Sequence, residues 1–182
     1  TKAATAQYTY THSGWTPTIS PVTGDVTFTA TFCQTVNKYT ITWVDGDGKT
    51  LKTEKLDYGT MPSYSGATPT KTATAQHTYT FNNKWSPSIV AVTKDATYTA
   101  QFDSIVKEYT VTYKVDGVQV GDVETYDFGE TVEIRDKFVK TGYTVSDWSV
   151  TADFTMPAEN VVITATSTVN QYTVTYKVDG VQ

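Results

Sequence analysis

The sequence predicts an all-β protein built from small tandem modules, and three observations carry this prediction. Threonine supplies 38 of the 182 residues and tyrosine 13, whereas leucine supplies only two. β-Branched and aromatic residues favour strands, and leucine favours helices. Several segments alternate apolar residues with threonine at the period of two that a half-buried strand requires. The same motifs also recur along the chain, which indicates an array of similar units.

Each repeat opens with a predicted strand. Tyr39–Trp43 reads YTITW, which places three large side chains on one face and the threonines on the other. The motif returns as Tyr109–Tyr113 and as Tyr172–Tyr176, 70 and then 63 residues further on. Asp-Gly pairs follow the first two copies, in the segments Asp45–Gly48 and Val115–Gly117. These pairs predict hairpin turns, because glycine accepts a positive φ.

A second strand and a tight turn come next. The chain reaches Asp57–Gly59 in one repeat and Asp127–Gly129 in the other, and the glycine marks the turn. The aromatic residues of these turns are Tyr58 and Phe128. A sugar-binding platform needs exposed rings, and rings beside a turn are better placed for exposure than rings inside a strand. We therefore take Tyr58 and Phe128 as candidate ligand-binding residues.

The second half of each repeat predicts two more strands. An alternating strand covers Gln7–His12 and Gln76–Phe81, and the third repeat has Thr141–Trp148 in its place. The closing strands are expected at Thr27–Phe32, Thr97–Phe102 and Val161–Thr166. About four short strands per repeat are near the minimum for a sheet that is stable alone.

These strands group into modules with predicted boundaries. Residues 1–37 are the C-terminal half of a module, residues 38–107 and 108–170 are complete modules, and residues 171–182 supply the first strand of another. The period exceeds the 20 to 50 residues of most solenoid repeats, so each copy should have its own core. The joins lack Gly/Ser or Pro runs, so we expect an elongated array with restricted bending. Because Thr1 falls inside a repeat, we expect a fragment, and the missing signal peptide says nothing about localisation.

The tryptophans are the expected core residues. Trp15, Trp85 and Trp148 occupy equivalent positions in successive repeats, so each is predicted to anchor the core of its module. Trp43 lies on the same strand face as Ile41 and is also predicted to be buried.

The residues that could carry chemistry form no recognisable catalytic or metal-binding pattern. His12 and His77 occupy non-equivalent places in their strands, and neither has metal-ligand spacing. Asp45 and Asp47 resemble the start of a calcium loop. The later oxygen ligands of such a loop are missing, however, and a hairpin turn explains the glycines. We therefore predict no enzymatic activity, no cofactor and no metal site.

Charge and cysteine content limit the partners. The formal net charge is -5 and the pI is near 4.9, so neither nucleic acid nor an anionic membrane is expected as a partner. No apolar run is long enough to insert into a bilayer. Cys33 is the only cysteine, and Asp103 stands at the equivalent position of the next repeat. We expect an exposed, unpaired thiol, with a disulfide between chains as the alternative.

Three segments together resemble a known family. They are Tyr172–Gly180 (YTVTYKVDG), Gly142–Ser149 (GYTVSDWS) and Met156–Ile163 (MPAENVVI). Their order and spacing are similar to the Listeria–Bacteroides repeat, also called the internalin B-repeat. The resemblance implies a β-grasp-like module in long secreted or wall-attached bacterial proteins, with an adhesin stalk or accessory binding role. The insert Ala67–Ala75 and the absence of the family's Gly-Gly pair depart from its pattern, and we expect little or no helix.

The function expected from these observations is a non-enzymatic stalk or spacer in an extracellular bacterial adhesin. One alternative is a multivalent binding module for a host glycan or surface protein, in which weak single contacts add up. The other is self-association. The opening strand near the C-terminus could complete the N-terminal half-module of another molecule and build a filament head to tail. Its candidate strand-donating residues are Tyr172, Val174, Tyr176 and Val178.

Overall fold

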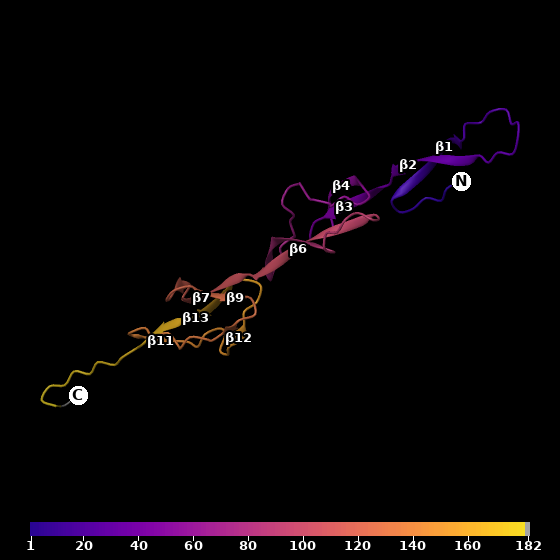
Figure 1. The fold of residues 1–182 in the computed structure, drawn as a ribbon. Coiled ribbons are helices and arrows are strands. Elements are labelled where there is room, and N and C mark those ends of the chain that lie inside the picture. Colours follow the sequence, from indigo (N-terminus) through magenta and orange to yellow (C-terminus); the bar gives the residue numbers. More distant parts are fainter. Residues whose placement is uncertain (181–182) are drawn as a thin grey trace. The chain divides into compact units, whose positions relative to one another are not determined.

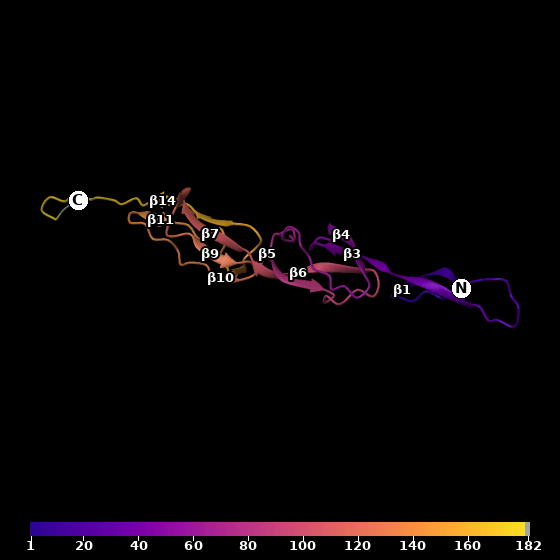
Figure 2. The same ribbon diagram turned by 45° about the horizontal axis from the view of Figure 1, so that its top comes forward.

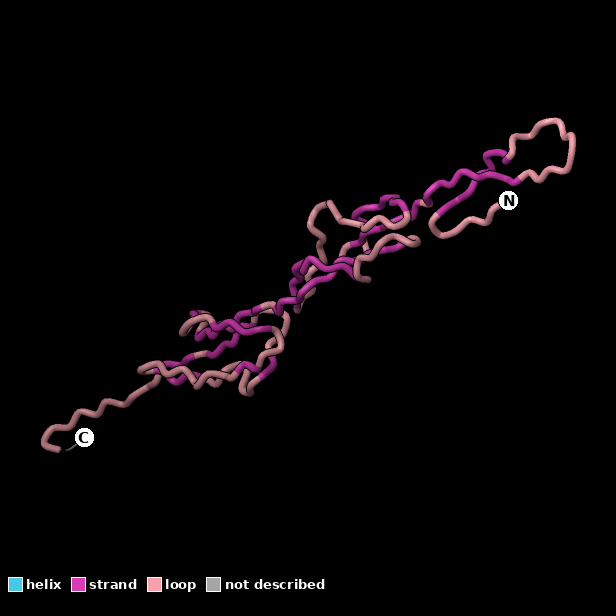
Figure 3. Tube along the Cα trace, in the orientation of Figure 1, coloured by secondary structure: helices cyan, strands magenta, loops and turns pink. Residues whose placement is uncertain are grey.

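Every regular element in the computed structural model, which describes residues 1–180, is a β-strand (Figure 3). The all-β prediction is therefore confirmed, and the described residues contain no helix. The strands are β1 (Tyr8–Thr16), β2 (Thr29–Val36), β3 (Lys38–Val44), β4 (Thr50–Asp57), β5 (His77–Ser86), β6 (Ala96–Val106), β7 (Glu108–Val115), β8 (Val118–Gln119), β9 (Glu124–Asp127), β10 (Thr131–Val132), β11 (Tyr143–Val145), β12 (Phe154–Thr155), β13 (Val161–Ala165) and β14 (Ser167–Val169).

The chain divides into two compact units. The first unit contains residues 1–72 and 79–104, and the second contains residues 73–78 and the chain from Ile105 onward. The short segment 73–78 therefore packs with the repeat that follows it rather than with its own. This division into two units does not test the four modules expected from the sequence, so their boundaries remain a prediction.

The first unit is organised around a four-stranded sheet with the order β4-β3-β6-β5. Strand β3 pairs antiparallel with β4 and parallel with β6, and Figure 1 shows these three strands side by side. The parallel register places Ile41 opposite Ala96 and Trp43 opposite Tyr98. The first and last strands of this repeat are thus neighbours that run in the same direction. A separate two-stranded antiparallel sheet, β1-β2, precedes them.

The second unit repeats this arrangement with shorter strands. Strand β7 pairs parallel with β13 and antiparallel with β8 and β9, and Figure 2 shows β7 beside β9. The parallel register places Val111 opposite Val161 and Tyr113 opposite Ile163. Residues 120–123 interrupt the second hairpin arm, and Gly121 has a φ of 72°. The third repeat therefore has more and shorter strands than the four expected, including the pairs β10-β12 and β11-β14.

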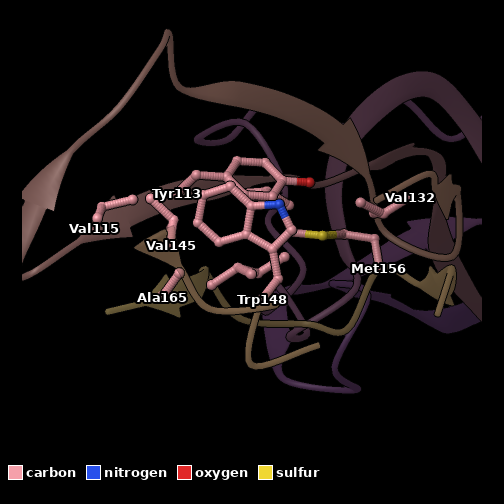
Figure 4. Close-up of a cluster of buried hydrophobic side chains, with 9 residues drawn as sticks. Tyr113, Val115, Val132, Val145, Trp148, Met156 and Ala165 are labelled. Carbon is pink, nitrogen blue, oxygen red and sulfur yellow. The ribbon is translucent and has the colours of Figure 1, made fainter. Parts of the chain in front are cut away.

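Each unit has its own apolar core, formed by the inward faces of the alternating strands. In the first unit, Trp43 is 0% exposed and packs with Ile41, Val92 and Tyr98. The second core is larger, and Figure 4 shows Tyr113, Trp148 and Met156 converging in it. The rings of Tyr113 and Trp148 lie 5.1 Å apart, edge to face. The predicted burial of Trp43 and of Trp148 is confirmed.

Two sequence predictions are wrong at the outer elements, and the reason is the same. Trp15 was expected in a core but is 44% exposed, because the described β1-β2 ribbon has no second layer over it. The closing strand expected at Thr27–Phe32 is present as β2, which begins two residues later, at Thr29. The strand expected at Tyr172–Val178 lies outside the fourteen strands, and its large side chains are exposed. A strand pattern in the sequence produces a strand only where a partner strand is present.

Candidate functional site

The predicted ligand-binding residues Tyr58 and Phe128 are half-buried at the turns where the sequence places them. Each belongs to a different unit, so the structure does not bring them into one site. The backbone N–H of Tyr58 donates to Asn37 O at 2.8 Å, and that of Phe128 donates to Lys107 O at 2.8 Å. The turn backbone therefore lies beside the start of a repeat, and a role of the two rings in ligand binding remains a prediction.

The start of the second repeat is hydrogen-bonded to the β1-β2 hairpin that precedes it. The Asn37 N–H donates to Gln7 O at 2.9 Å. The Tyr39 hydroxyl donates to Ala6 O at 2.6 Å, and the Asn37 side-chain amide donates to Thr5 O at 2.8 Å. We call this set of bonds the junction clamp. Its donors are the residue just before an opening strand and the first tyrosine of that strand. Its acceptors are carbonyl groups of the preceding hairpin.

The junction clamp recurs at the start of the third repeat. The Lys107 N–H donates to Gln76 O at 2.9 Å, and the Tyr109 hydroxyl donates to Ala75 O. A reduced version follows β14, where the Asn170 N–H donates to Gly142 O at 2.9 Å. Sequence reasoning missed this site, although the similar spacings from Gln7 to Tyr39 and from Gln76 to Tyr109, 32 and 33 residues, are visible in the sequence. The clamp explains why residues 73–78 pack with the second unit.

An open groove of about 400 Å³ lies beside Trp85 in the first unit. Trp85 packs against buried Trp43 with ring centres 4.7 Å apart, against Tyr64 at 4.9 Å and against Phe81 at 5.5 Å. The groove is completed by Pro62, Ser63, Gly66, Thr68, Pro69, Asn83 and Ile89, so its lining carries no charged side chain. Trp85 is thus half core residue and half groove wall. The sequence predicted only the first role, because the segment that forms the other wall has no strand pattern.

The equivalent tryptophan of the third repeat borders a groove of different chemistry. Its volume is about 410 Å³, and ionisable residues dominate its lining, namely Arg135, Asp136, Lys137, Asp147 and Asp153. The Arg135 guanidinium lies over the Tyr113 ring at 4.7 Å and forms an ion pair with Glu124 at 2.7 Å. Burial, helped by the hydrogen bond to Glu124, raises the pKa of Tyr126 to about 12, so this hydroxyl remains a donor well into the alkaline range.

The two aspartates of the possible calcium loop are bonded within the protein. Asp45 is buried, and its Oδ1 accepts the backbone N–H of Asp47 at 3.0 Å and of Lys49 at 2.8 Å. Asp47 Oδ2 accepts the hydroxyl of Thr72 at 2.7 Å and its N–H at 2.8 Å. These bonds close the β3-β4 hairpin and attach the insert Ala67–Ala75 to it. In residues 1–180, no three His, Cys, Asp or Glu residues gather as a metal site would require.

Asp116 plays a similar part in the second unit and should make its stability pH-dependent. The hydroxyl and then the N–H of Ser167 hold the pKa of the Asp116 carboxyl below its ordinary value of 3.8. A depressed folded-state pKa adds stability above the ordinary value, and this stability is lost as the pH falls through the folded pKa. We therefore expect the melting temperature of the second unit to decline on acidification below about pH 4.

Thermal melts of Asp116→Asn between about pH 2.5 and pH 6 test this expectation. The variant should melt lower than the wild type at pH 6 and converge with it at the acid end. Glu159→Gln removes an exposed carboxylate from the same repeat and should follow the wild-type profile. An Asp116→Asn profile parallel to that of the wild type would contradict the assignment.

Two further findings concern the cysteine and membrane insertion. Cys33 is exposed, as predicted. Within the described part of the chain, no helix offers the length and apolarity needed to cross a bilayer.

No known protein-family model matches the sequence. Two solved structures are similar at low score. One contains domains 3-4 of the Streptococcal High Identity Repeats in Tandem (SHIRT) of a cell surface protein, with 14% identity over 73% of this chain and 98% of that chain, at a TM-score of 0.32. The other is Mub-RV, with 14% identity over 74% of this chain and 99% of that chain, at a TM-score of 0.26.

Proposed function

We propose that this chain is a non-enzymatic spacer segment of an extracellular or surface-attached bacterial protein, and that it carries a binding domain away from the cell. The observation that carries the proposal is the parallel pairing of the first and last strands in each repeat, β3 with β6 and β7 with β13. Parallel neighbours start at the same end of a sheet. The chain therefore enters a repeat at one end of the sheet and leaves at the other, so each repeat adds length.

The junction clamp supports the same proposal. A spacer must resist folding back at its joins, and flexible linkers do not. At the starts of the second and third repeats, a backbone N–H and a tyrosine hydroxyl bind carbonyl groups of the preceding hairpin. We expect the three donors at Asn37 and Tyr39 and the two at Lys107 and Tyr109 to limit bending where one repeat follows another. The extracellular location and the bacterial source rest on the resemblance to the Listeria–Bacteroides repeat.

A binding role is the second candidate, and the groove beside Trp85 favours it. Partly exposed aromatic rings framed by neutral hydroxyl and amide groups suit a neutral sugar better than a charged ligand. The equivalent groove of the third repeat is lined by charged residues, however, so one ligand should not fit both. Multivalent binding of a single host glycan therefore has less support than the spacer. A glycan array that is blank for the wild-type chain, or unchanged by Trp85→Phe, would exclude the neutral groove as a lectin site.

Small-angle scattering tests the spacer. A compact globule of 182 residues would have a radius of gyration of about 16 Å, from chain-length scaling. An array with about 30 Å per repeat should give a value clearly above that, and the maximum dimension should grow by a constant step with each added repeat. A radius of gyration near 16 Å would overturn the proposal.

The clamp can be tested separately with Tyr109→Phe. This change removes the hydroxyl that binds Ala75 O and keeps the ring. We expect nearly unchanged melting but a broader distribution of distances between spin labels placed on the two sides of the join. Tyr126→Phe, which removes a hydroxyl within the second unit, is the matched control and should leave the distribution unchanged. An unaltered distribution in Tyr109→Phe would mean that the clamp does not restrict the join.

A further inference from the structure

The parallel strand pair in each of the two units determines how tension acts on that unit. A spacer that joins a cell to a bound partner transmits tension, so the inference rests on the proposed function. In the first unit the chain enters at the start of β3, at Lys38, and leaves through β6. In the second it enters at the start of β7, at Glu108, and leaves through β13. Because the two strands of each pair run in the same direction, tension slides them past each other.

Sliding and peeling load a strand pair differently. Sliding loads the evenly spaced hydrogen bonds of a parallel pair together, whereas peeling breaks bonds one after another from one end. In the first unit, four residue pairs share the load, residues 41–44 with 96–99. In the second unit five pairs share it, residues 111–115 with 161–165. We call each of these strand pairs, β3-β6 and β7-β13, a shear pair.

The shear pair of the second unit is fastened at both ends. At its start, Asn160 Oδ1 accepts the Thr110 N–H at 2.9 Å. At its end, the Asp116 N–H donates to Ala165 O at 3.0 Å, and Asp116 Oδ1 accepts the Ser167 N–H at 2.8 Å. Each of these bonds joins the two chain segments that tension pulls in opposite directions. They therefore add to the set that has to break together.

Both shear pairs share two further features. The first unit has the same fastening at its start, where Asp95 Oδ1 accepts the Thr40 N–H at 2.7 Å. The inner face of each pair is also buried, and Trp43, Tyr113 and Ile163 are 0% exposed. A slip of one residue turns the apolar set of a strand toward solvent. Core packing therefore opposes sliding together with the hydrogen bonds.

We propose that the two shear pairs give the spacer resistance to tension, so that each unit stays folded while the chain is pulled. Forced unfolding is governed by the rate of unfolding rather than by equilibrium stability. A small core can therefore resist force when the strands have to separate in one step. The antiparallel hairpins β3-β4 and β7-β9 complete the sheets, but tension along the chain does not slide one of their strands against the other.

Single-molecule pulling on the full chain tests the geometry, with handles on two introduced cysteines in a Cys33→Ser background. Glu108→Cys with Thr168→Cys slides the shear pair of the second unit. Glu108→Cys with Asp127→Cys pulls on paired neighbours at one end of the β7-β9 ladder and peels the same strand. We expect peeling to open the unit at less than about half the force of sliding, because bonds break one at a time. The length released, about 3.5 Å per residue between the handles, identifies the segment that opened.

Two variants that each remove one hydrogen bond test the shear pair itself. Asn160→Ala removes the acceptor of the Thr110 N–H and should lower the opening force in the sliding geometry. Tyr126→Phe removes the bond from the Tyr126 hydroxyl to Glu124, outside the shear pair, and should leave that force unchanged. Thermal melts of both variants establish that the second unit is folded before it is pulled.

Equal opening forces in the two geometries would overturn the proposal, and this comparison leaves the core unaltered. An opening force of folded Asn160→Ala equal to that of the wild type would also overturn it. Neither outcome bears on the spacer function, because scattering measures the length of the chain without load. A compact chain in scattering would in turn refute the spacer and leave the two opening forces to be compared as before.

Discussion

Replacement of Trp43 by alanine is expected to unfold the sheet of the first unit while the second unit stays folded. Trp43 is fully buried, and its ring lies 4.7 Å from Trp85, 5.0 Å from Tyr98 and 5.5 Å from Tyr64. Truncation of a buried tryptophan typically costs about 3–5 kcal/mol. A core of this size supplies about the same amount in total, so the loss should exceed what the unit can tolerate at 37 °C.

Heteronuclear NMR spectra can follow both units of the Trp43→Ala variant at once. Amide resonances of β3, β4 and β6 should collapse to unfolded positions, and those of β7 and β13 should remain where they are. Trp15→Ala is the matched control, because Trp15 is 44% exposed and its removal leaves no cavity in a core. A dispersed first-unit spectrum in Trp43→Ala would show that the aromatic cluster does not hold the sheet.

The sequence was sufficient to predict the strands whose partners are close along the chain or repeated in it. The alternation of Ile41 and Trp43 with threonines predicted β3, and the Asp-Gly pairs predicted its hairpin, because both signals are local. The parallel pairing of β3 with β6 was not predicted. Nothing in the local pattern of Thr97–Phe102 distinguishes a neighbour of β3 from a neighbour of β4, since that choice depends on the connection between the strands.

Burial at equivalent positions was the least predictable property. Trp15, Trp85 and Trp148 align in the sequence, yet one is exposed, one forms a groove wall and one is buried. Their local environments in the sequence are alike, and the difference comes from the layer that covers them. The identical segments 109–115 and 172–178 make the same point more sharply, because one is a central strand and the other lies outside the fourteen strands.

The candidate site was predictable only in part, for a related reason. The turns that carry Tyr58 and Phe128 follow from their glycines, and both residues are half-buried in those turns. The junction clamp and the Trp85 groove depend instead on segments without strand periodicity, 73–78 and 62–69. The acceptors in the clamp are backbone carbonyl groups, among them those of Ala6 and Ala75, and no side-chain pattern marks them.

Two replacements of Trp148 should destabilise the second unit to different extents. The Trp148 ring packs on Tyr113 in the nine-residue core, and its indole N–H donates to the carbonyl groups of Arg135 at 3.0 Å and Asp136 at 3.2 Å. Trp148→Phe keeps most of the buried ring but leaves those carbonyl groups without their donor, at a cost of about 1–3 kcal/mol. Trp148→Ala also removes the ring and should cost about 3–5 kcal/mol.

The order of stability expected in urea titrations is therefore wild type, Trp148→Phe, Trp148→Ala. In both Trp148 variants the remaining tryptophans, Trp15, Trp43 and Trp85, all lie in the first unit, so tryptophan fluorescence reports that unit. Its midpoint should be the same in the two variants, because the two cores share no residue. A loss of the first unit together with the second would show that the repeats fold as one cooperative block. That result would mean that the junction clamp couples the folding of neighbouring repeats. In a spacer of independent repeats, by contrast, one repeat can unfold while the others stay folded and extended.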